Sequence, residues 1–329
     1  MFEIMIIGAG PAGISMAVEA RRSGINQDKI LLLEKSDNHS WSIRRFYPEK
    51  KLVTANYKGN DAVCSGVMCI DDSTKNETLS YLDHAIEKYN LQVHYGESVY
   101  KIEKKQDTFF EIITDKATYQ SKVCVIAIGI LGKPNRPRYV IPAAIKNKVH
   151  FDITSTEIKN QKVLVVGGGD SASEYVQYLI QEGNEVSLSY RGDSFLRMNE
   201  INRNSLLALK EQGKIQIYLQ SNIESLDSNE NSRPIVNFQE VHLGSEDFDH
   251  VILALGGSTP KNFLSLLGIE FEGNEPVVKE GYETSVKGLF LIGDLSAGKK
   301  GGSIISAFNS SRVAIQKICD DYLGCKVGF

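Results

Sequence analysis

A glycine-rich turn near the start of the chain has the residue types and spacing of a site for a phosphorylated cofactor. Gly8 permits a tight turn, Gly10 lets the backbone approach a pyrophosphate, and Gly13 lets the next helix pack closely on the preceding strand. That helix begins at Pro11 and Ala12, so its first N–H groups and its positive dipole end face the phosphate. The turn therefore predicts a dinucleotide site.

A carboxylate follows at the end of the second apolar strand. Glu34 closes that strand at the spacing at which an acid accepts hydrogen bonds from both ribose hydroxyls. It would repel a 2′-phosphate, which favours FAD or NAD over NADP. The alternative is a solvated strand end, which the spacing makes less favourable.

A second acidic position lies near the C-terminus. The stretch Gly288–Asp294 reads as a strand that ends in Gly293 and Asp294. Asp294 is placed to bind a ribityl hydroxyl, and Ser303 and Ile304 begin a helix whose N–H groups can face the flavin pyrimidine oxygen. Because NAD alone needs no such second motif, the pair of motifs predicts FAD.

A second glycine turn occurs in the middle of the chain. It reads Gly167, Gly168, Gly169, Asp170, Ser171, Ala172, a GxGxxA form. Where the first unit carries an acid, this one carries Tyr190 and Arg191, with Arg197 and Arg203 following. Arginine can pair with a 2′-phosphate, so NADP(H) is favoured over NAD(H). The alternative is a solvated, arginine-rich surface turn.

Each turn sits between a strand and a helix, and a further strand follows, which predicts an α/β protein with two Rossmann-like dinucleotide-binding domains. Two similar stretches, Val123–Pro134 and Val251–Pro260, are interpreted as crossings between the domains. The FAD domain is expected at 1–131 and 250–329, with the NAD(P)H domain inserted at 132–249. The expected elements are strands at 2–7, 29–34, 162–166 and 185–190 and helices at 11–23 and 171–181.

The composition narrows the class of protein. The chain has 329 residues and a net charge of −4, which argues against a general nucleic-acid binder. The start of the chain carries no cationic leader, and its longest apolar run, Val123–Leu131, is too short to span a bilayer. The cysteines number 5, an odd and scattered set that predicts free thiols and a cytoplasmic location.

Taken together, these motifs resemble the low-molecular-weight thioredoxin-reductase family over nearly the whole chain. The resemblance implies an FAD domain interrupted by an NADPH domain, and a homodimer. Members that reduce thioredoxin carry Cys-x-x-Cys shortly before the second glycine turn, where this chain reads His150, Phe151, Asp152, Ile153. These side chains cannot replace a dithiol, so thioredoxin reduction by that route is excluded.

The stretches Phe46–Lys50 and Val149–Phe151 are similar to a branch of that family, the thioredoxin-reductase-type ferredoxin/flavodoxin–NADP reductases, with the flavodoxin:quinone reductase type closest. By similarity, Tyr47 stacks on the isoalloxazine ring, a role that suits its π-face. Lys35, Trp41 and Gly129 complete the expected FAD contacts, and Gly256 completes those of NADP.

The resemblance implies electron transfer between NADP(H) and flavodoxin or ferredoxin by way of FAD, with small quinones as further acceptors. Hydride transfer between nicotinamide and flavin needs positioning rather than a side-chain acid or base, so no catalytic residue beyond Tyr47 is expected. An acidic partner is expected to dock on basic residues near the flavin edge. These are Arg44, Arg45, Lys50, Lys51, Lys299 and Lys300, with a solvated loop face as the alternative.

Other enzyme classes remain open. Cys64 and Cys69 have the C-x4-C spacing of disulfide reductases, with two buried structural cysteines as the stronger interpretation. A disulfide reductase without its own Cys-x-x-Cys, of the bacillithiol-disulfide type, is the main alternative, and a flavin-bound sensor is a third. No metal is expected, because the histidines show no ligand spacing. Those interpreted as structural are His39, His84, His94, His242 and His250; His150 lies nearer the expected flavin only by resemblance.

Overall fold

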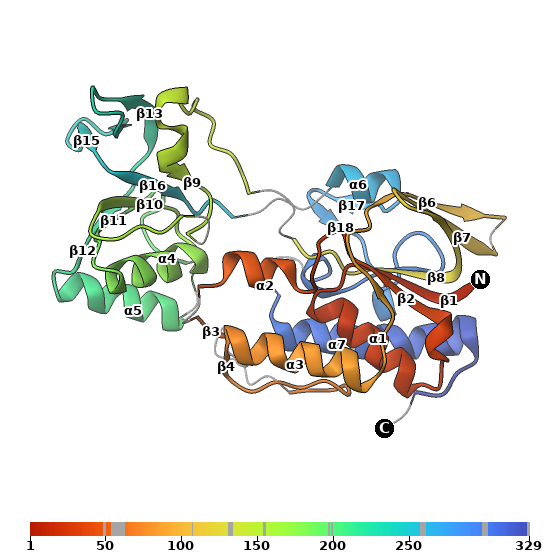
Figure 1. Cartoon of the computed structure of the whole chain (residues 1–329). Coiled ribbons are helices and arrows are strands. Elements are labelled where there is room, and N and C mark those ends of the chain that lie inside the picture. Colours follow the sequence, from red (N-terminus) through yellow and green to blue (C-terminus); the bar gives the residue numbers. More distant parts are fainter. Residues whose placement is uncertain are drawn as a thin grey trace. The chain divides into compact units, whose positions relative to one another are not determined.

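The computed structural model describes the chain except residues 49–50, 54–62, 107, 131–133, 154–155, 197, 199, 257–260, 298–301 and 328–329. The chain folds into two compact units (Figure 1). Unit 1 comprises Met1–Arg44, Leu52–Gly132 and Ser258–Phe329, and unit 2 comprises Arg45–Lys51 and Lys133–Gly257. The chain therefore leaves unit 1 and returns to it twice, first for a short segment and then for a whole domain.

Unit 1 is built on a sheet in the order β5-β2-β1-β8-β7-β6, with β19 paired to β8. The strands β5, β2, β1, β8 and β19 run parallel, whereas β6, β7 and β8 form an antiparallel meander. The core of β1 has no exposed surface at Ile4, Met5 and Ile6, as expected for a strand covered on both faces. The strands are β1 (Phe2–Ile7), β2 (Ile30–Leu33), β5 (Val93–His94), β6 (Val99–Lys105), β7 (Phe109–Thr114), β8 (Thr118–Ile126) and β19 (Leu289–Leu291).

Helices cover this sheet, and α1 packs against α7 (Figure 1). Pro11 stands at the first position of α1, where its missing N–H costs nothing. The helices are α1 (Pro11–Arg22), α3 (Lys75–Lys88), α6 (Lys261–Leu266) and α7 (Ile304–Ile318), and α2 (Trp41–Phe46) carries the chain from unit 1 into unit 2. Two small antiparallel pairs complete the unit: β3 (Leu52–Val53) with β4 (Ser73–Thr74), and β17 (Phe271–Glu272) with β18 (Glu275–Pro276).

Unit 2 repeats this design on a smaller scale. Its parallel sheet has the order β12-β11-β10-β16-β9, and a three-stranded antiparallel sheet, β13-β14-β15, accompanies it. The elements are β9 (Val149–His150), β10 (Lys162–Val166), α4 (Asp170–Gln181), β11 (Glu185–Tyr190), α5 (Glu200–Glu211), β12 (Ile215–Leu219), β13 (Ile223–Ser228), β14 (Pro234–Phe238), β15 (Ser245–Asp247) and β16 (His250–Leu253). The predicted fold class, α/β with two Rossmann-like domains, is confirmed.

The return crossing lies later in the chain than expected. β16 pairs with β10 and β9, so the structure places residues 250–257 in unit 2 rather than in the outer domain. The apolar sequence of β16 does not distinguish the two domains, because a buried parallel strand is apolar in both. No helix in the described ranges is long and apolar enough to cross a membrane.

The expectation of free thiols is wrong for four cysteines. Cys64 is bonded to Cys69 and Cys319 to Cys325, while Cys124 is free and buried. Burial raises the pKa of the Cys124 thiol, which makes it inert. The alternative of two buried structural cysteines also fails at the first pair, because Cys69 is exposed and Cys64 is half-buried.

Two histidines meet in the parallel sheet of unit 2. His150 Nε2 lies 2.9 Å from His250 Nδ1, and the two rings tilt toward each other. Burial, with repulsion from His150 and Lys148, lowers the pKa of His250 to about 4, and burial also lowers the pKa of His150. Both rings are therefore neutral in the folded protein at neutral pH.

We expect unit 2 to lose stability as the pH falls from the ordinary histidine pKa of 6.5 toward about 4. In that window the unfolded chain binds a proton that the folded His250 does not, so stability is present at high pH and lost on acidification. His250→Gln should reduce the loss by about 1 kcal/mol, since solvent screens this half-exposed ring. Melting temperatures near neutrality and about two pH units lower measure the effect.

The matched control is His84→Gln, because His84 is exposed on α3 of unit 1. It should leave the pH dependence as in the parent. An identical fall in melting temperature for His250→Gln and the parent would contradict the assignment.

Candidate cofactor sites

The first glycine turn uses two of its glycines for close packing. Gly8 has φ +105°, and a Cβ there would lie 2.5 Å from the carbonyl oxygen of Ala127. A Cβ on Gly13 would collide with the carbonyl oxygen of Gly8. Side chains at these positions would push α1 away from β1, so the two glycines fix the helix against the sheet.

The third glycine of this turn faces open space. A Cβ on Gly10 would meet nothing within 4 Å, and the backbone there has φ −81°, which any residue adopts. Gly10 caps α1 without a side-chain hydrogen bond, and in the described chain the amides of Ala12 and Gly13 have no acceptor. The turn thus presents N–H groups without a described acceptor beside the open space at Gly10, as a pyrophosphate site requires.

Glu34 is buried against this turn rather than solvated. The residue is only 7% exposed, and its carboxylate accepts a hydrogen bond from the Ala9 amide at 2.9 Å. The Ser36 amide and hydroxyl donate to its other oxygen at 2.9 and 2.7 Å. The oxygen that accepts from Ala9 has only this one donor, so a ribose hydroxyl can still donate to it.

Asp294 lies at the same edge of the sheet. β1, β8 and β19 run parallel and adjacent, so the residues that follow them, including Gly8, Gly129 and Gly293, share the carboxyl edge. Burial raises the pKa of Asp294, and no hydrogen bond or ion pair to its carboxylate is present among the described residues. Asp294 is half-buried, and a carboxylate that no described residue partners fits a ligand hydroxyl.

The start of α7 supplies further donors near Asp294. Gly302 packs so closely on the Asp294 side chain that a Cβ would collide with it. Ser303 caps α7 and forms a reciprocal capping box with Ser306, whereas the amides of Ile304 and Ile305 lack a described acceptor. These residues therefore fit FAD, with its pyrophosphate at α1, a ribityl hydroxyl at Asp294 and the pyrimidine at α7.

The second glycine turn has the same geometry. Gly167 has φ +153°, and a Cβ there would collide with the carbonyl oxygen of Ala254, while Gly169 faces open space. Gly169 caps α4 without a side-chain bond, and Asp170, Ser171 and Ala172 form the first turn of the helix. The turn at Gly167–Gly169 therefore fits a second pyrophosphate.

The strand register assigns the residue that corresponds to Glu34. Ile7 pairs with Leu33 in unit 1, and Val166 pairs with Ser189 in unit 2. The position of Glu34 is thus taken by Tyr190, whose ring packs on Gly168 and stacks on Phe195 at 5.5 Å. Arg191 comes next and is exposed, with no ion pair to a described acid. This arrangement fits a 2′-phosphate, since Tyr190 and Arg191 follow the second strand where unit 1 has the acid Glu34.

The remaining expected contacts lie nearby or outside the described residues. The Lys35 ammonium lies 5.7 Å from the centre of the Trp41 ring in unit 1. Gly129 and Gly256 both have positive φ, and the Gly256 carbonyl accepts from the Asn135 amide at 2.9 Å. Arg197 falls outside the described residues.

Tyr47 belongs to unit 2 in this structure. The Lys51 ammonium lies 3.7 Å from the centre of its ring and 2.7 Å from a Glu174 oxygen. Burial disfavours the charged form of Lys51, but Tyr47 and Glu174 outweigh it and raise the pKa. The stacking of Tyr47 on flavin stays a prediction.

The expected docking residues that the structure describes are engaged within the protein. Arg44 lies 3.7 Å from Asp83, Arg45 lies 3.4 Å from Asp152, and Lys51 pairs with Glu174. Sequence reasoning missed these acids because they lie far along the chain and follow no motif. Lys50, Lys299 and Lys300 lie outside the described residues, so the docking role stays a prediction that rests on them.

Comparison with known proteins agrees with this geometry. The family model described as pyridine nucleotide-disulphide oxidoreductase matches residues 5–293. A ferredoxin–NADP reductase of Ignicoccus hospitalis is 27% identical over 305 residues, covering 91% of this chain and 92% of that protein. Ferredoxin–NADP reductase 2 of Christiangramia forsetii is 27% identical over 325 residues, covering 95% and 87%.

Solved structures share the fold. The bacillithiol disulfide reductase of Bacillus cereus has a TM-score of 0.82 at 21% identity, covering 97% of this chain and 99% of that one. The thioredoxin reductase of Lactococcus lactis has a TM-score of 0.78 at 25% identity, covering 97% and 98%.

The fold and the two glycine turns define a two-domain dinucleotide-binding flavoprotein of the thioredoxin-reductase-like class. The chain belongs to the pyridine nucleotide-disulphide oxidoreductase family. Its cofactors are FAD and NADP(H), and the predicted resemblance is confirmed at this level.

Paired substitutions separate the two sites. Gly10→Ala should fold normally but purify with little FAD, because the methyl group enters the open space that the pyrophosphate needs. We expect FAD affinity to fall at least about tenfold, or ~1.4 kcal/mol. The flavin-to-protein absorbance ratio and FAD titration of the apoprotein measure it.

Gly169→Ala is the matched variant, since its Cβ also enters open space. It should retain FAD and lose a similar factor in NADPH affinity. Equal flavin content in Gly10→Ala and the parent would show that the N-terminal turn does not bind FAD.

Proposed function

We propose that this chain is an FAD-dependent reductase that moves electrons between NADP(H) and a flavodoxin or ferredoxin, and that also reduces small quinones. The observation that carries the proposal is the segment where a thioredoxin reductase has its dithiol. Here the chain reads His150 to Ile153 without a cysteine, and His150 bonds to His250 while Asp152 contacts Arg45. Relatives named ferredoxin–NADP reductase support an electron-carrier acceptor.

The protein's own residues supply binding and orientation. Bound FAD would supply two-electron chemistry with NADPH and one- or two-electron chemistry with the acceptor, which suits one-electron carriers and quinones. Glu34 and Asp294 hold hydroxyl groups of the flavin nucleotide, and the amino ends of α1 and α7 neutralise its phosphates and pyrimidine oxygen. No side-chain proton donor is required, so pH should affect binding more than the transfer itself.

The coenzyme preference rests on Tyr190 and Arg191. In unit 1 the equivalent of Tyr190 is an acid that would repel a 2′-phosphate. In unit 2 the Tyr190 ring offers a flat surface beside the turn, and the exposed Arg191 guanidinium can pair with the phosphate.

Arg191→Gln should lower kcat/KM for NADPH by roughly 10- to 100-fold and leave that for NADH nearly unchanged, since one charge-assisted pair is worth about 1.5–3 kcal/mol. Steady-state rates with ferricyanide as acceptor measure both coenzymes. Lys214→Gln is the control. Lys214 is exposed just before β12, so it lies at the amino ends of the parallel strands, whereas Arg191 follows the carboxyl end of β11. Equal losses with both coenzymes would refute the role of Arg191 in 2′-phosphate recognition.

The acceptor is tested by turnover with NADPH against purified flavodoxin, ferredoxin, a benzoquinone and a panel of disulfides. We expect the electron carriers to give the highest kcat/KM, with slower quinone reduction. Turnover of a low-molecular-weight disulfide above that of the carriers would instead support the alternative, a disulfide reductase without its own Cys-x-x-Cys. We also propose, from the family resemblance, a cytoplasmic homodimer.

A further inference from the structure

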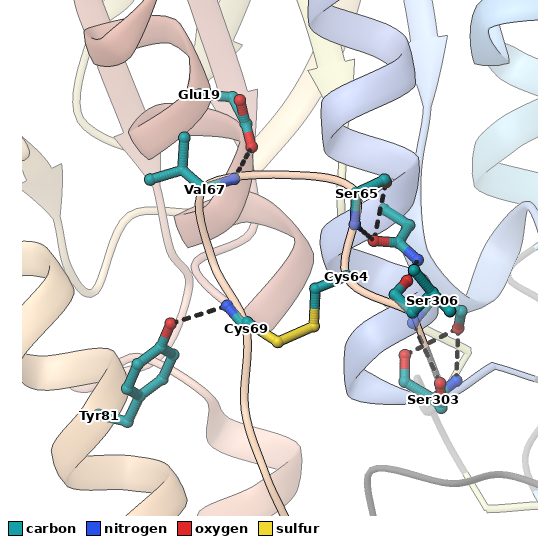
Figure 2. The surroundings of a disulfide bond; sticks show 10 residues. Glu19, Cys64, Ser65, Val67, Cys69, Tyr81, Ser303 and Ser306 are labelled. Atoms are coloured by element: carbon teal, nitrogen blue, oxygen red, sulfur yellow. Dashed lines mark hydrogen bonds between the residues drawn. A yellow bond between two sulfur atoms is a disulfide. The ribbon is translucent and has the colours of Figure 1, made fainter. Parts of the chain in front are cut away.

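The Cys64–Cys69 disulfide closes a short loop that contacts α1, α3 and α7 of unit 1. Figure 2 shows this loop beside Glu19 of α1, Tyr81 of α3 and the start of α7 at Ser303 and Ser306. Neither the glycine turns nor the proposed electron transfer uses this disulfide. Hydrogen bonds nonetheless join this loop to each of the three helices.

One half of the loop is fixed to α7. The Asn309 carboxamide oxygen accepts hydrogen bonds from the Ser65 amide and hydroxyl, both at 2.9 Å. The same carboxamide donates to the Val63 carbonyl at 2.8 Å. Cys64 is therefore held between two anchored neighbours, and it is half-buried.

The tip of the loop covers a buried carboxylate. Glu19 has no exposed surface, and it accepts from the Val67 amide at 2.6 Å and from Arg312 at 3.2 Å (Figure 2). A Cβ on Gly66 would collide with the Glu19 carboxylate, so only glycine lets the backbone lie this close. The loop thereby shields an ion pair that joins α1 to α7.

The other half of the loop is open. Cys69 is exposed, and its amide donates to the Tyr81 hydroxyl at 3.0 Å (Figure 2). The two cysteines thus differ in exposure, because Cys64 is half-buried between anchored neighbours and Cys69 is exposed. In thiol–disulfide exchange, access decides which sulfur is attacked.

We propose that Cys64–Cys69 is a thiol–disulfide exchange site for small-molecule thiols, attacked at Cys69. The incoming thiolate bonds to Cys69 Sγ as the bond between the two cysteine sulfurs breaks, and Cys64 leaves as the thiolate. A second thiolate attacks the sulfur of the first thiol in the mixed disulfide and releases the Cys69 thiolate. Two thiols are oxidised to one disulfide, the protein disulfide is reduced by two electrons, and both cysteine thiolates take protons from water.

The chain contains a matched control pair. Cys319–Cys325 has a sequence separation of 6, against 5 for Cys64–Cys69, so the loop-closure contributions to the two disulfides are similar. In the control pair Cys319 is fully buried at the end of α7 and Cys325 is half-buried, whereas in the first pair Cys64 is half-buried and Cys69 is exposed. A difference in reactivity therefore reports access and anchoring rather than loop length.

The first test treats the full-length, FAD-loaded protein with graded glutathione, followed by rapid alkylation and peptide mass spectrometry. We expect Cys64 and Cys69 to open at least about tenfold faster than Cys319 and Cys325, with the first glutathione adduct on Cys69. Opening of both pairs at the same rate, or of Cys319–Cys325 first, would overturn the proposal.

The second test compares the access of a disulfide reagent to each sulfur when the other cysteine is absent. Cys64→Ser and Cys69→Ser are each incubated with oxidised glutathione, and the adduct is quantified by intact mass. Cys69 of the Cys64→Ser variant should form the mixed disulfide about tenfold faster than Cys64 of the Cys69→Ser variant, because Cys64 stays anchored through Asn309. Equal or reversed rates would show that the exposed sulfur is not the point of attack.

This inference does not rest on the electron-transfer function. Adduct formation is read by mass, so it can succeed in a protein that reduces no flavodoxin and fail in one that does.

Discussion

The contact between Gly13 and the Gly8 carbonyl brings the start of α1 against the end of β1. No side chain fits between these backbones, so the amino end of the helix must point along the sheet edge. That edge is where β8 and β19 also end, and where Gly129 and Asp294 follow them. Because parallel strands share one carboxyl edge, Gly8 and Asp294, from opposite ends of the chain, lie at the same edge of the sheet.

Unit 2 contains the same constraint with a different residue at the decisive position. Gly167 packs on the Ala254 carbonyl as Gly8 packs on that of Ala127, and Gly169 is as open as Gly10. The units differ after the second strand. In unit 1 the Glu34 carboxylate accepts a hydrogen bond from the Ala9 amide, whereas in unit 2 the Tyr190 ring packs on Gly168. One backbone design thus recurs in both units, with a different side chain after the second strand.

The two helices expected at the FAD site, α1 and α7, are also bonded to each other. Ser311 of α7 donates to the Ala12 carbonyl in the first turn of α1 at 3.0 Å, and Arg312 reaches Glu19 further along. Glu19 is fully buried, and it is stabilised because Arg312 and the Val67 amide satisfy its oxygens. The loop closed by Cys64 and Cys69 lies over this pair and bonds to α1 through Glu19 and to α7 through Asn309.

The sequence by itself determined the two glycine turns, the strands and helices around them, and the strand-end acid. These features are local, because a turn followed by a helix fixes its geometry within about 25 residues. Only the tertiary structure decided how the side chains are partnered. It paired Arg44, Arg45 and Lys51 with distant acids, left Asp294 without a described partner and joined cysteines that had been expected to be free. Each of these outcomes depends on which residues folding brings within a few ångströms, and spacing along the chain does not encode that for side chains far apart.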